Sequence, residues 1–206
     1  MKKAILFIPA RIGSKRLLKK NIQEVWGKPM IEWVIKEALE AELVSEVIVG
    51  SDSEEVIKIA LDAGANTVKR GRHYCTDNVS KIDAGKEMSI KWGISQDVPI
   101  VLAQANSPEV DFETINEMVT VLNSTDRKEV ITTWKGNQHG ALRAVKDYSQ
   151  LWTPHLSYKL AYLERDWVDI HTEEDLNEVE GTRKAAHLRR DSSSASGVTT
   201  GCSEAN

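Results

Sequence analysis

Near the N-terminus the sequence reads Ala4-Ile5-Leu6-Phe7-Ile8-Pro9-Ala10-Arg11-Ile12-Gly13-Ser14-Lys15-Arg16-Leu17-Leu18-Lys19-Lys20-Asn21, an apolar run followed by a strongly basic segment. The apolar run is continuous and ends at a proline, which is typical of a short strand that is buried on both faces. Five of the ten residues from 11 to 20 are lysine or arginine. A buried strand that ends in a cationic loop indicates an anion-binding site at the edge of a sheet.

The rest of the chain alternates between helical and extended patterns. Helices are predicted at Pro29–Leu43, at Ser80–Trp92 and at Asp111–Leu122, and a further helix carries Val56, Ile57, Ala60 and Leu61 on one face and ends before Gly64. Strands are predicted at Val47–Val49, Asn66–Lys69, Pro99–Gln104 and Val130–Trp134. This alternation through short loops predicts a three-layer, Rossmann-like α/β fold with a mostly parallel sheet. Because ligands lie beyond the carboxyl ends of such strands, we expect the loops after Ile8, Val49 and Gln104 to line one crevice.

The composition predicts one domain and a C-terminal tail. The chain has 206 residues, of which 41% are hydrophobic, enough for a single well-buried core. We assign residues 1–190 to this domain. Residues 191–206 are rich in serine, glycine and threonine and show no periodicity, so they are expected to be disordered.

Charge and cysteine usage exclude several classes of protein. The formal net charge of −4 argues against a dedicated nucleic-acid binder. Cys75 and Cys202 are too few and too far apart to indicate a disulfide scaffold or a zinc site. No stretch approaches the roughly 20 apolar residues that a membrane span needs, so no membrane partner is expected and a cytoplasmic location is the default.

The basic loop suits a polyphosphate physically. Gly13 and Ser14 allow backbone amides to approach a bound anion, and the surrounding cations neutralise its charge. Composition alone leaves a second interpretation open, a basic turn that is simply solvated. The loop matches neither the Walker A pattern nor the Gly-x-Gly-x-x-Gly pattern of dinucleotide-binding proteins.

A family resemblance favours the first interpretation. The segments Ile8-Pro9-Ala10-Arg11-x-Gly13-Ser14-Lys15-Arg16, Lys20-Asn21 and Gly27-Lys28-Pro29-Met30-Ile31 together resemble the opening of the acylneuraminate cytidylyltransferases, or CMP-sialic acid synthetases. In that family this segment wraps the triphosphate of CTP. The resemblance implies a nucleotidyltransferase fold and these nucleotide-binding residues: Ala10, Arg11, Gly13, Ser14, Lys20 and Asn21. It also implies catalytic roles for Arg11 and Lys20, and Arg16 is a further candidate on charge alone.

Two later segments follow in the same order. Residues 76–80, Thr-Asp-Asn-Val-Ser, resemble the loop that recognises cytosine, which implies nucleotide contacts by Asp77 and Ser80. Either side chain could also cap the next helix, and the two roles are compatible. Residues 102–108 resemble a Leu-Leu-Gln-Pro-Thr-Ser-Pro segment, which implies that Gln104 faces the nucleotide and the acceptor. Asn106 stands where the CMP-Kdo relatives carry a metal-binding aspartate, and a neutral amide is a poorer magnesium ligand.

A segment near the C-terminus resembles the family's metal-binding segment. Residues 167–176 resemble an Ile-Asp-Ile-Asp-Thr-x-x-Asp-Leu pattern, which implies that Asp169 is a catalytic metal ligand and places His171 at the second ligand position. Alternation would put both on one face of a strand. Three alternatives follow: weakened Mg²⁺ binding through Asp169 and the phosphates, which we favour, a shift toward Mn²⁺, or lost activity. Thr172 and Asp175 are interpreted as a helix capping box.

The resemblance predicts a cytidylyltransferase that transfers CMP from CTP to a small acidic keto-sugar of the sialic acid, nonulosonic or Kdo type. Pyrophosphate would be released, and the product would serve cell-surface glycan biosynthesis. The region at about 135–168 is shorter than the acceptor-binding and dimer-forming insertion of the family, so a monomer and a homodimer both stay open. Two alternatives follow from this region and from His171: a smaller acceptor, such as a sugar phosphate, alditol phosphate or phosphonate, or a catalytically impaired nucleotide-binding homologue.

Overall fold

A seven-stranded sheet forms the centre of the protein in the computed structural model, which describes residues 1–76, 78–95, 97–135, 137–151 and 159–181. The strand order is β5-β4-β1-β6-β8-β7-β9. The bounds are β1 (Ala4–Pro9), β4 (Val44–Ser51), β5 (Asn66–Lys69), β6 (Ile100–Ala103), β7 (Glu129–Trp134), β8 (Asn137–Val145) and β9 (Leu160–Glu164). Every neighbouring pair is parallel except the two that contain β8. The predicted mostly parallel α/β fold is therefore confirmed.

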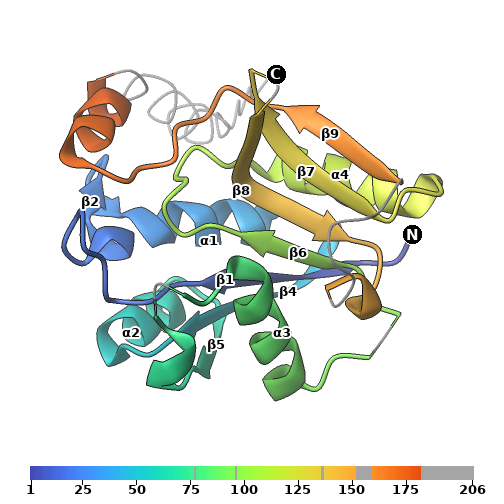
Figure 1. Ribbon diagram of the computed structural model, residues 1–206, viewed down its shortest axis with the longest axis horizontal. Coiled ribbons are helices and arrows are strands. Elements are labelled where there is room, and N and C mark those ends of the chain that lie inside the picture. The colour runs from blue at the N-terminus through green and yellow to red at the C-terminus, as the bar shows by residue number, and fades with distance from the viewer. Residues whose placement is uncertain (77, 96, 136, 152–158, 182–206) are drawn as a thin grey trace, which may run out of the picture.

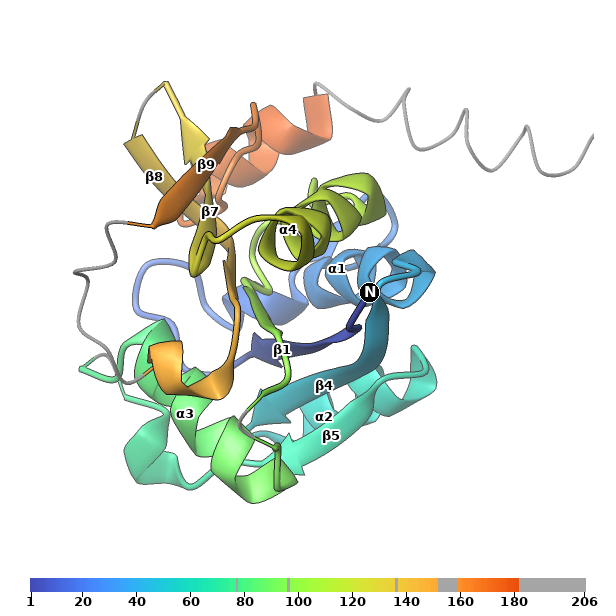
Figure 2. The same ribbon diagram turned by 90° about the vertical axis from the view of Figure 1, so that its right-hand side faces the viewer.

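Helices cover both faces of this sheet. On one face lie α1 (Met30–Glu40), α2 (Glu54–Asp62) and α4 (Phe112–Ser124), which pack on the alternate β1 residues Leu6 and Ile8. On the other face α3 (Lys81–Trp92) packs through Met88 on Ile5 and Phe7, together with the 3₁₀ helix η3 (Tyr148–Leu151). Figures 1 and 2 show α1 and α3 on opposite sides of β1, as a three-layer fold requires.

Capping side chains determine where α3 and α4 begin. Ser80 accepts a hydrogen bond from the amide of Asp83 (3.1 Å) and so caps α3, as its position in the sequence predicts. Asp111 caps α4 in the same way, through the amide of Thr114 (2.7 Å). The cap at Ser80 fixes the first turn of α3 at the carboxyl edge of the sheet. No helix in the described ranges is both long enough and apolar enough to cross a membrane.

A third cluster of buried side chains joins the basic loop to the C-terminal part of the described chain. Leu17, Met30 and Trp33 pack against Ile170 and Val179. The loop continues into the short 3₁₀ helix η1 (Lys20–Ile22) and a ribbon of β2 (Glu24–Val25) and β3 (Lys28–Pro29). Residues 173–181 are helical and follow directly after the predicted metal-binding segment. This packing holds that segment against the basic loop.

Two features differ from the sequence-based expectations. Strands β8 and β9 were not predicted, and β8 inserts antiparallel between β6 and β7. The strand expected around Asp169 is absent, since no residue from 165 to 172 is assigned to a strand. A backbone hydrogen bond from the amide of Ile170 to the carbonyl of Asn106 (3.0 Å) holds this segment beside the end of β6 instead. The predicted tail at 191–206 lies outside the described residues.

Candidate functional site

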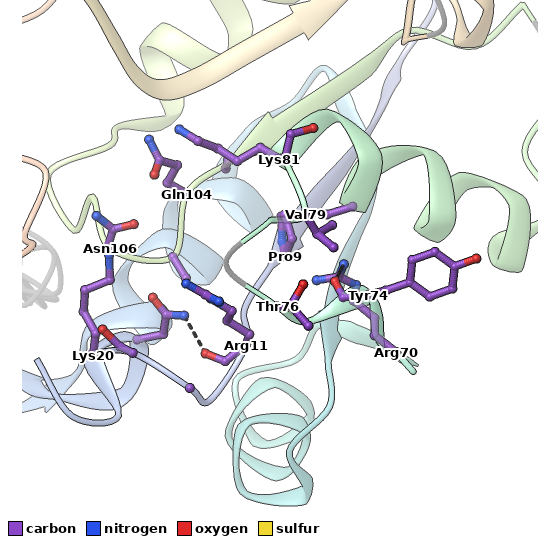
Figure 3. Close-up of a pocket in the computed structure, with 17 residues that line it drawn as sticks. Pro9, Arg11, Lys20, Arg70, Tyr74, Thr76, Val79, Lys81, Gln104 and Asn106 are labelled. Carbon is purple, nitrogen blue, oxygen red and sulfur yellow. Dashed lines mark hydrogen bonds between the residues drawn. The ribbon is translucent and has the colours of Figure 1, made fainter. Parts of the chain in front are cut away.

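A cavity of about 220 Å³ opens at the carboxyl ends of β1 and β6. Three segments line it: the basic loop, the residues between β5 and the first turns of α3, and the residues after β6. Seven of the predicted site residues meet here: Arg11, Gly13, Ser14, Lys20, Asn21, Ser80 and Gln104. Figure 3 shows Tyr74, Thr76 and Val79 on the side opposite Lys20 and Asn106. Asp77 lies outside the described residues.

Ala10 and the loop after β4 do not line the cavity. Ala10 is fully buried, and its amide donates to the carbonyl of Gly50 at 2.8 Å, so neither group faces the cavity. Asp52 accepts a hydrogen bond from the amide of Ile12 at 3.2 Å. The expectation that the loop after Val49 lines the crevice is therefore wrong. This loop supports the basic loop from behind.

The basic loop is held at both ends. The Asn21 side chain donates to the carbonyl of Arg11 at 3.0 Å, the dashed line in Figure 3, and so closes the loop on itself. Lys19 forms an ion pair with Glu55 at 2.6 Å, and Leu17 is buried in the third cluster. Gly13 between these anchors is exposed, and a Cβ added to it would meet no described atom within 4 Å. The loop can therefore approach an anion closely without first having to fold.

A second hollow of about 410 Å³ continues from the cavity along the basic loop. Four of its six lining residues are cations, Arg11, Lys15, Arg16 and Lys20, and the other two are Ser14 and His171. Burial lowers the pKa of Lys20 to about 8, nearby Asp169 acts in the opposite direction, and Arg11 adds to the lowering. Like charges gathered around one hollow create a positive potential that a polyphosphate would neutralise. We call this space the cationic hollow.

His171 lines the cationic hollow next to Lys20. Its Nδ1 lies 3.3 Å from Nζ of Lys20. Burial first, and then the charge of Lys20, lower the pKa of His171, which favours a neutral imidazole that accepts a hydrogen bond from the lysine. The Asp169 carboxylate accepts hydrogen bonds from Gln104 Nε2 (3.3 Å) and from the Ser107 hydroxyl. In the part of the chain that the structure describes, no three His, Cys, Asp or Glu side chains gather as a metal-binding group.

Two sets of hydrogen bonds position residues 168–171. Asn106 donates from Nδ2 to the carbonyl of Ile170 at 3.0 Å, and Glu109 accepts from the amide of Val168 at 2.7 Å. Asp175 accepts hydrogen bonds from the amides of His171 (2.7 Å) and Thr172 (2.9 Å), while the Thr172 hydroxyl accepts from the amide of Asp175 (3.2 Å). The predicted capping box is confirmed. By holding the Ile170 carbonyl, the side-chain amide of Asn106 helps to position Asp169, the residue before Ile170.

The Asn106 contact gives a stability prediction. Asn106 is 5% exposed, so an Asn106→Ala change would leave the Ile170 carbonyl without its side-chain partner. We expect the free energy of unfolding, measured by urea denaturation, to fall by about 1–3 kcal/mol. Asn137→Ala is the control, because Asn137 is exposed and its side chain donates locally to the carbonyl of Lys135 at 3.4 Å. Equal, small losses in both variants would show that Asn106 does not anchor the segment.

The polar cavity residues that the sequence-based prediction missed are Arg70, Tyr74, Thr76 and Lys81. Arg70 is buried, and its guanidinium donates to Glu87 (2.8 Å) and to the carbonyl of Tyr74 (2.6 Å). It directly follows the predicted strand Asn66–Lys69, so the rule that ligands lie at carboxyl ends could have singled it out. Lys81 is the first residue of α3, where a lysine gives no sequence signal of a site.

The chain resembles proteins of known activity. It is 34% identical over 112 residues to a 3-deoxy-manno-octulosonate cytidylyltransferase of Lawsonia intracellularis, a match that covers 54% of this chain and 42% of that protein. It is 32% identical over 172 residues to an N-acylneuraminate cytidylyltransferase of Escherichia coli, covering 82% of this chain and 40% of that protein. The chain thus spans less than half the length of either relative.

Similarity of fold extends further than similarity of sequence. A solved structure of a CMP:2-keto-3-deoxy-manno-octonic acid synthetase complexed with CTP aligns with a TM-score of 0.72 at 18% identity, over 92% of this chain and 100% of that one. A family model described as cytidylyltransferase matches residues 5–191. That range includes every segment that lines the cavity and the cationic hollow. The chain belongs to the cytidylyltransferase family.

Proposed function

We propose that this protein transfers CMP from CTP to an acidic keto-sugar of the sialic acid, nonulosonic or Kdo type and releases pyrophosphate, as a step in cell-surface glycan biosynthesis. The observation that carries the proposal is the continuity of two spaces. The cavity and the cationic hollow share Arg11, Ser14 and Lys20, so a nucleoside in the first would extend its phosphates into the second. The relatives named above support CMP transfer to such an acceptor.

The far side of the cavity suits the nucleoside. It is lined by Arg70, Tyr74, Thr76 and Val79, away from the cations of the basic loop. The buried guanidinium of Arg70 is held by Glu87, so its position does not depend on a ligand. A fixed guanidinium provides donors for the O2 and N3 acceptors of cytosine, whereas the N3 of uracil carries a hydrogen and would mismatch.

The transfer step needs charge stabilisation more than a covalent nucleophile. A hydroxyl oxygen of the acceptor forms a bond to the α-phosphorus, and the bond from that phosphorus to the bridging oxygen of the β-phosphate breaks. The hydroxyl proton passes to solvent, and pyrophosphate leaves with the electron pair of the broken bond. Arg11 and Lys20 border the cationic hollow and would stabilise the charge on the leaving group.

A divalent ion fits this site through one carboxylate. Mg²⁺ commonly takes one or two protein carboxylates and completes its shell with phosphate oxygens and water. Asp169 would hold the ion, and hydrogen bonds from Gln104 and Ser107 orient its carboxylate. When bound, the ion supplies positive charge at the reacting phosphates. Since Nδ1 of His171 faces Lys20, we assign His171 to orienting that lysine and keep Mn²⁺ as the alternative ion.

The pKa of Lys20 predicts a pH dependence of CTP binding. At pH values below about 8 the ammonium is charged and can donate to phosphate, and above that value it loses its proton. We expect the dissociation constant of CTP, measured by calorimetry, to be roughly tenfold larger at pH 9 than at pH 7. The Lys20→Gln variant should show a flatter profile. If Lys20→Gln kept the wild-type pH profile, the group that titrates would be a residue other than Lys20.

A pyrophosphate-release assay tests the proposed function. The protein is incubated with CTP, with Mg²⁺ or Mn²⁺, and with a panel of acidic keto-sugars, sugar phosphates, alditol phosphates and phosphonates. We expect release with an acidic keto-sugar. Release only with phosphorylated acceptors or phosphonates would move the reaction to a smaller acceptor. CTP binding without release for any acceptor under either ion would identify a catalytically impaired homologue and overturn the proposal.

A further inference from the structure

A third space of about 340 Å³ adjoins the nucleotide cavity on the α3 side of the sheet. It shares four lining residues with that cavity, Pro9, Ser80, Lys81 and Ala103. Most of its other lining is apolar and comes from α3 and from β6, β7, β8 and β9: Ile82, Leu102, Ile131, Leu142 and Leu160. We call this space the acceptor-side cavity.

The three spaces lie in series. The cationic hollow and the acceptor-side cavity each share residues with the nucleotide cavity but none with each other. Transfer at phosphorus places the attacking and the leaving oxygen roughly in line on opposite sides of the phosphorus. If pyrophosphate leaves through the cationic hollow, the acceptor must approach from the other side. The acceptor-side cavity adjoins the nucleotide cavity away from the cationic hollow, so we take it as that side, and Lys81 lines both of the adjoining cavities.

Lys81 is positioned at this junction by β8. Its ammonium donates to the carbonyl of Gly140 at 3.1 Å, and a Cβ on Gly140 would lie 2.7 Å from Lys81 Nζ and 2.9 Å from Gln104 Nε2. Glycine at this position therefore leaves space for both donors, which point toward one another in Figure 3. The Lys81 ammonium lies in a concave site, and this partial burial lowers its pKa. The rest of the residue is open to solvent.

Two other cations on β8 and directly after it have partners. Arg143, which also lines the acceptor-side cavity, forms an ion pair with Glu129 at 2.6 Å. Lys146 donates to the carbonyl of Thr125 at 2.8 Å, outside this cavity. Lys81, in contrast, forms no ion pair with any residue in the described ranges. The Asp169 carboxylate is near enough to raise the pKa of Lys81, against the effect of burial, but no hydrogen bond joins these two described side chains. An ammonium has three N–H donors, so those that the Gly140 carbonyl does not take can bind an anionic ligand.

Resting on the proposed CMP transfer, we propose that Lys81 binds the acidic group of the acceptor, and that the apolar wall beside it selects acidic sugars that carry acyl or deoxy substituents. Of the residues that form this apolar wall, Leu102, Ile131 and Leu142 are buried, and Ile82 and Leu160 are partly exposed. Burying about 50 Å² of an acyl group there would raise affinity roughly tenfold over the unsubstituted sugar. A sugar with hydroxyl groups at every position would gain nothing from this wall.

The test compares Lys81→Gln with Lys86→Gln. Lys86 lies on the same helix, pairs with Asp83 at 3.2 Å and lines none of the three spaces, so it controls for lost charge on α3. For each protein we would measure CTP affinity by calorimetry, and kcat and KM for an acidic acceptor and for its methyl ester. Lys81→Gln should raise KM for the acid about 10- to 100-fold and leave KM for the ester unchanged. Lys81→Arg should preserve part of the preference for the acid, and Lys86→Gln should behave like the wild type.

The outcomes separate this inference from the proposed function. If the wild type releases pyrophosphate but Lys81→Gln keeps the same acid-to-ester preference, the assignment of Lys81 is wrong and CMP transfer stands. If Lys81→Gln instead weakens CTP binding and keeps the preference, Lys81 is a nucleotide ligand, which also overturns the inference. A wild type that prefers the acceptor without acyl groups contradicts the role of the apolar wall. A wild type that is inactive with every acceptor overturns the proposed function and this inference together.

Discussion

Replacing Lys20 with glutamine is expected to weaken CTP binding by roughly 10- to 100-fold at pH 7. The estimate follows from hydrogen bonds to charged groups, which contribute about 1.5–3 kcal/mol. Lys20 lines both the nucleotide cavity and the cationic hollow, so its ammonium is placed where the phosphates would pass from one space into the other. Calorimetric titration of CTP into both proteins measures the difference directly.

The matched control is Lys19→Gln in the neighbouring position. Lys19 carries the same charge, but it pairs with Glu55 at 2.6 Å and lines neither space. We expect its loss to change CTP affinity by less than about threefold, as for an exposed ion pair. Similar losses in both variants would mean that the loop attracts nucleotides through its general charge alone, without a defined lysine contact.

Asp169→Asn is expected to reduce kcat by at least about 100-fold, which corresponds to roughly 2.7 kcal/mol of lost transition-state stabilisation. The asparagine keeps the size of the side chain: its one amide oxygen can accept from Gln104, and its Nδ2 can donate to the Ser107 hydroxyl if that hydroxyl rotates, so the local structure should persist. What changes is the negative charge that would hold the divalent ion. Steady-state kinetics over a range of Mg²⁺ concentrations measure the effect, and CTP affinity without metal should change little.

Asp166→Asn provides the comparison for this variant. Asp166 lies three residues away, is exposed, accepts a hydrogen bond from the indole of Trp134 at 2.9 Å and does not line the cavity. Its kcat should stay within about twofold of the wild type. If Asp169→Asn kept full activity at every Mg²⁺ concentration, Asp169 would not hold the ion, and metal binding would have to rest on the phosphates alone.

Much of the fold follows from local sequence patterns. The continuous apolar run of β1, the helical spacing in α1 and α4, and the capping side chain of Ser80 each act within a few residues, so the sequence reports them directly. The same applies to the cluster of cations in the basic loop. The parallel topology then brings the ends of β1 and β6 together, which explains why most of the predicted site residues share one cavity.

The features that escaped prediction depend on contacts distant in sequence. Strand β8 contains Gly140 with a positive φ of 80° and the charged Arg143, so it has no continuous apolar run, and its pairing with β6 defines it. Strand β9 is an edge strand with a partly exposed pattern. Lys81 acquires its surroundings from Gly140, 59 residues further along the chain. Long-range pairing of this kind overrides local propensity and leaves no periodic signal.

The most direct measurement is a calorimetric titration of the wild-type protein with CTP, UTP and ATP, each at pH 7 and without acceptor. A fixed guanidinium at Arg70 and a cationic hollow that begins at Lys20 predict saturable binding of CTP. CTP should bind at least about tenfold more tightly than UTP or ATP, because a mismatched buried polar contact costs about 1–3 kcal/mol. Equal affinities for the three nucleotides, or no binding of CTP, would contradict a cytidine nucleotide site in this cavity.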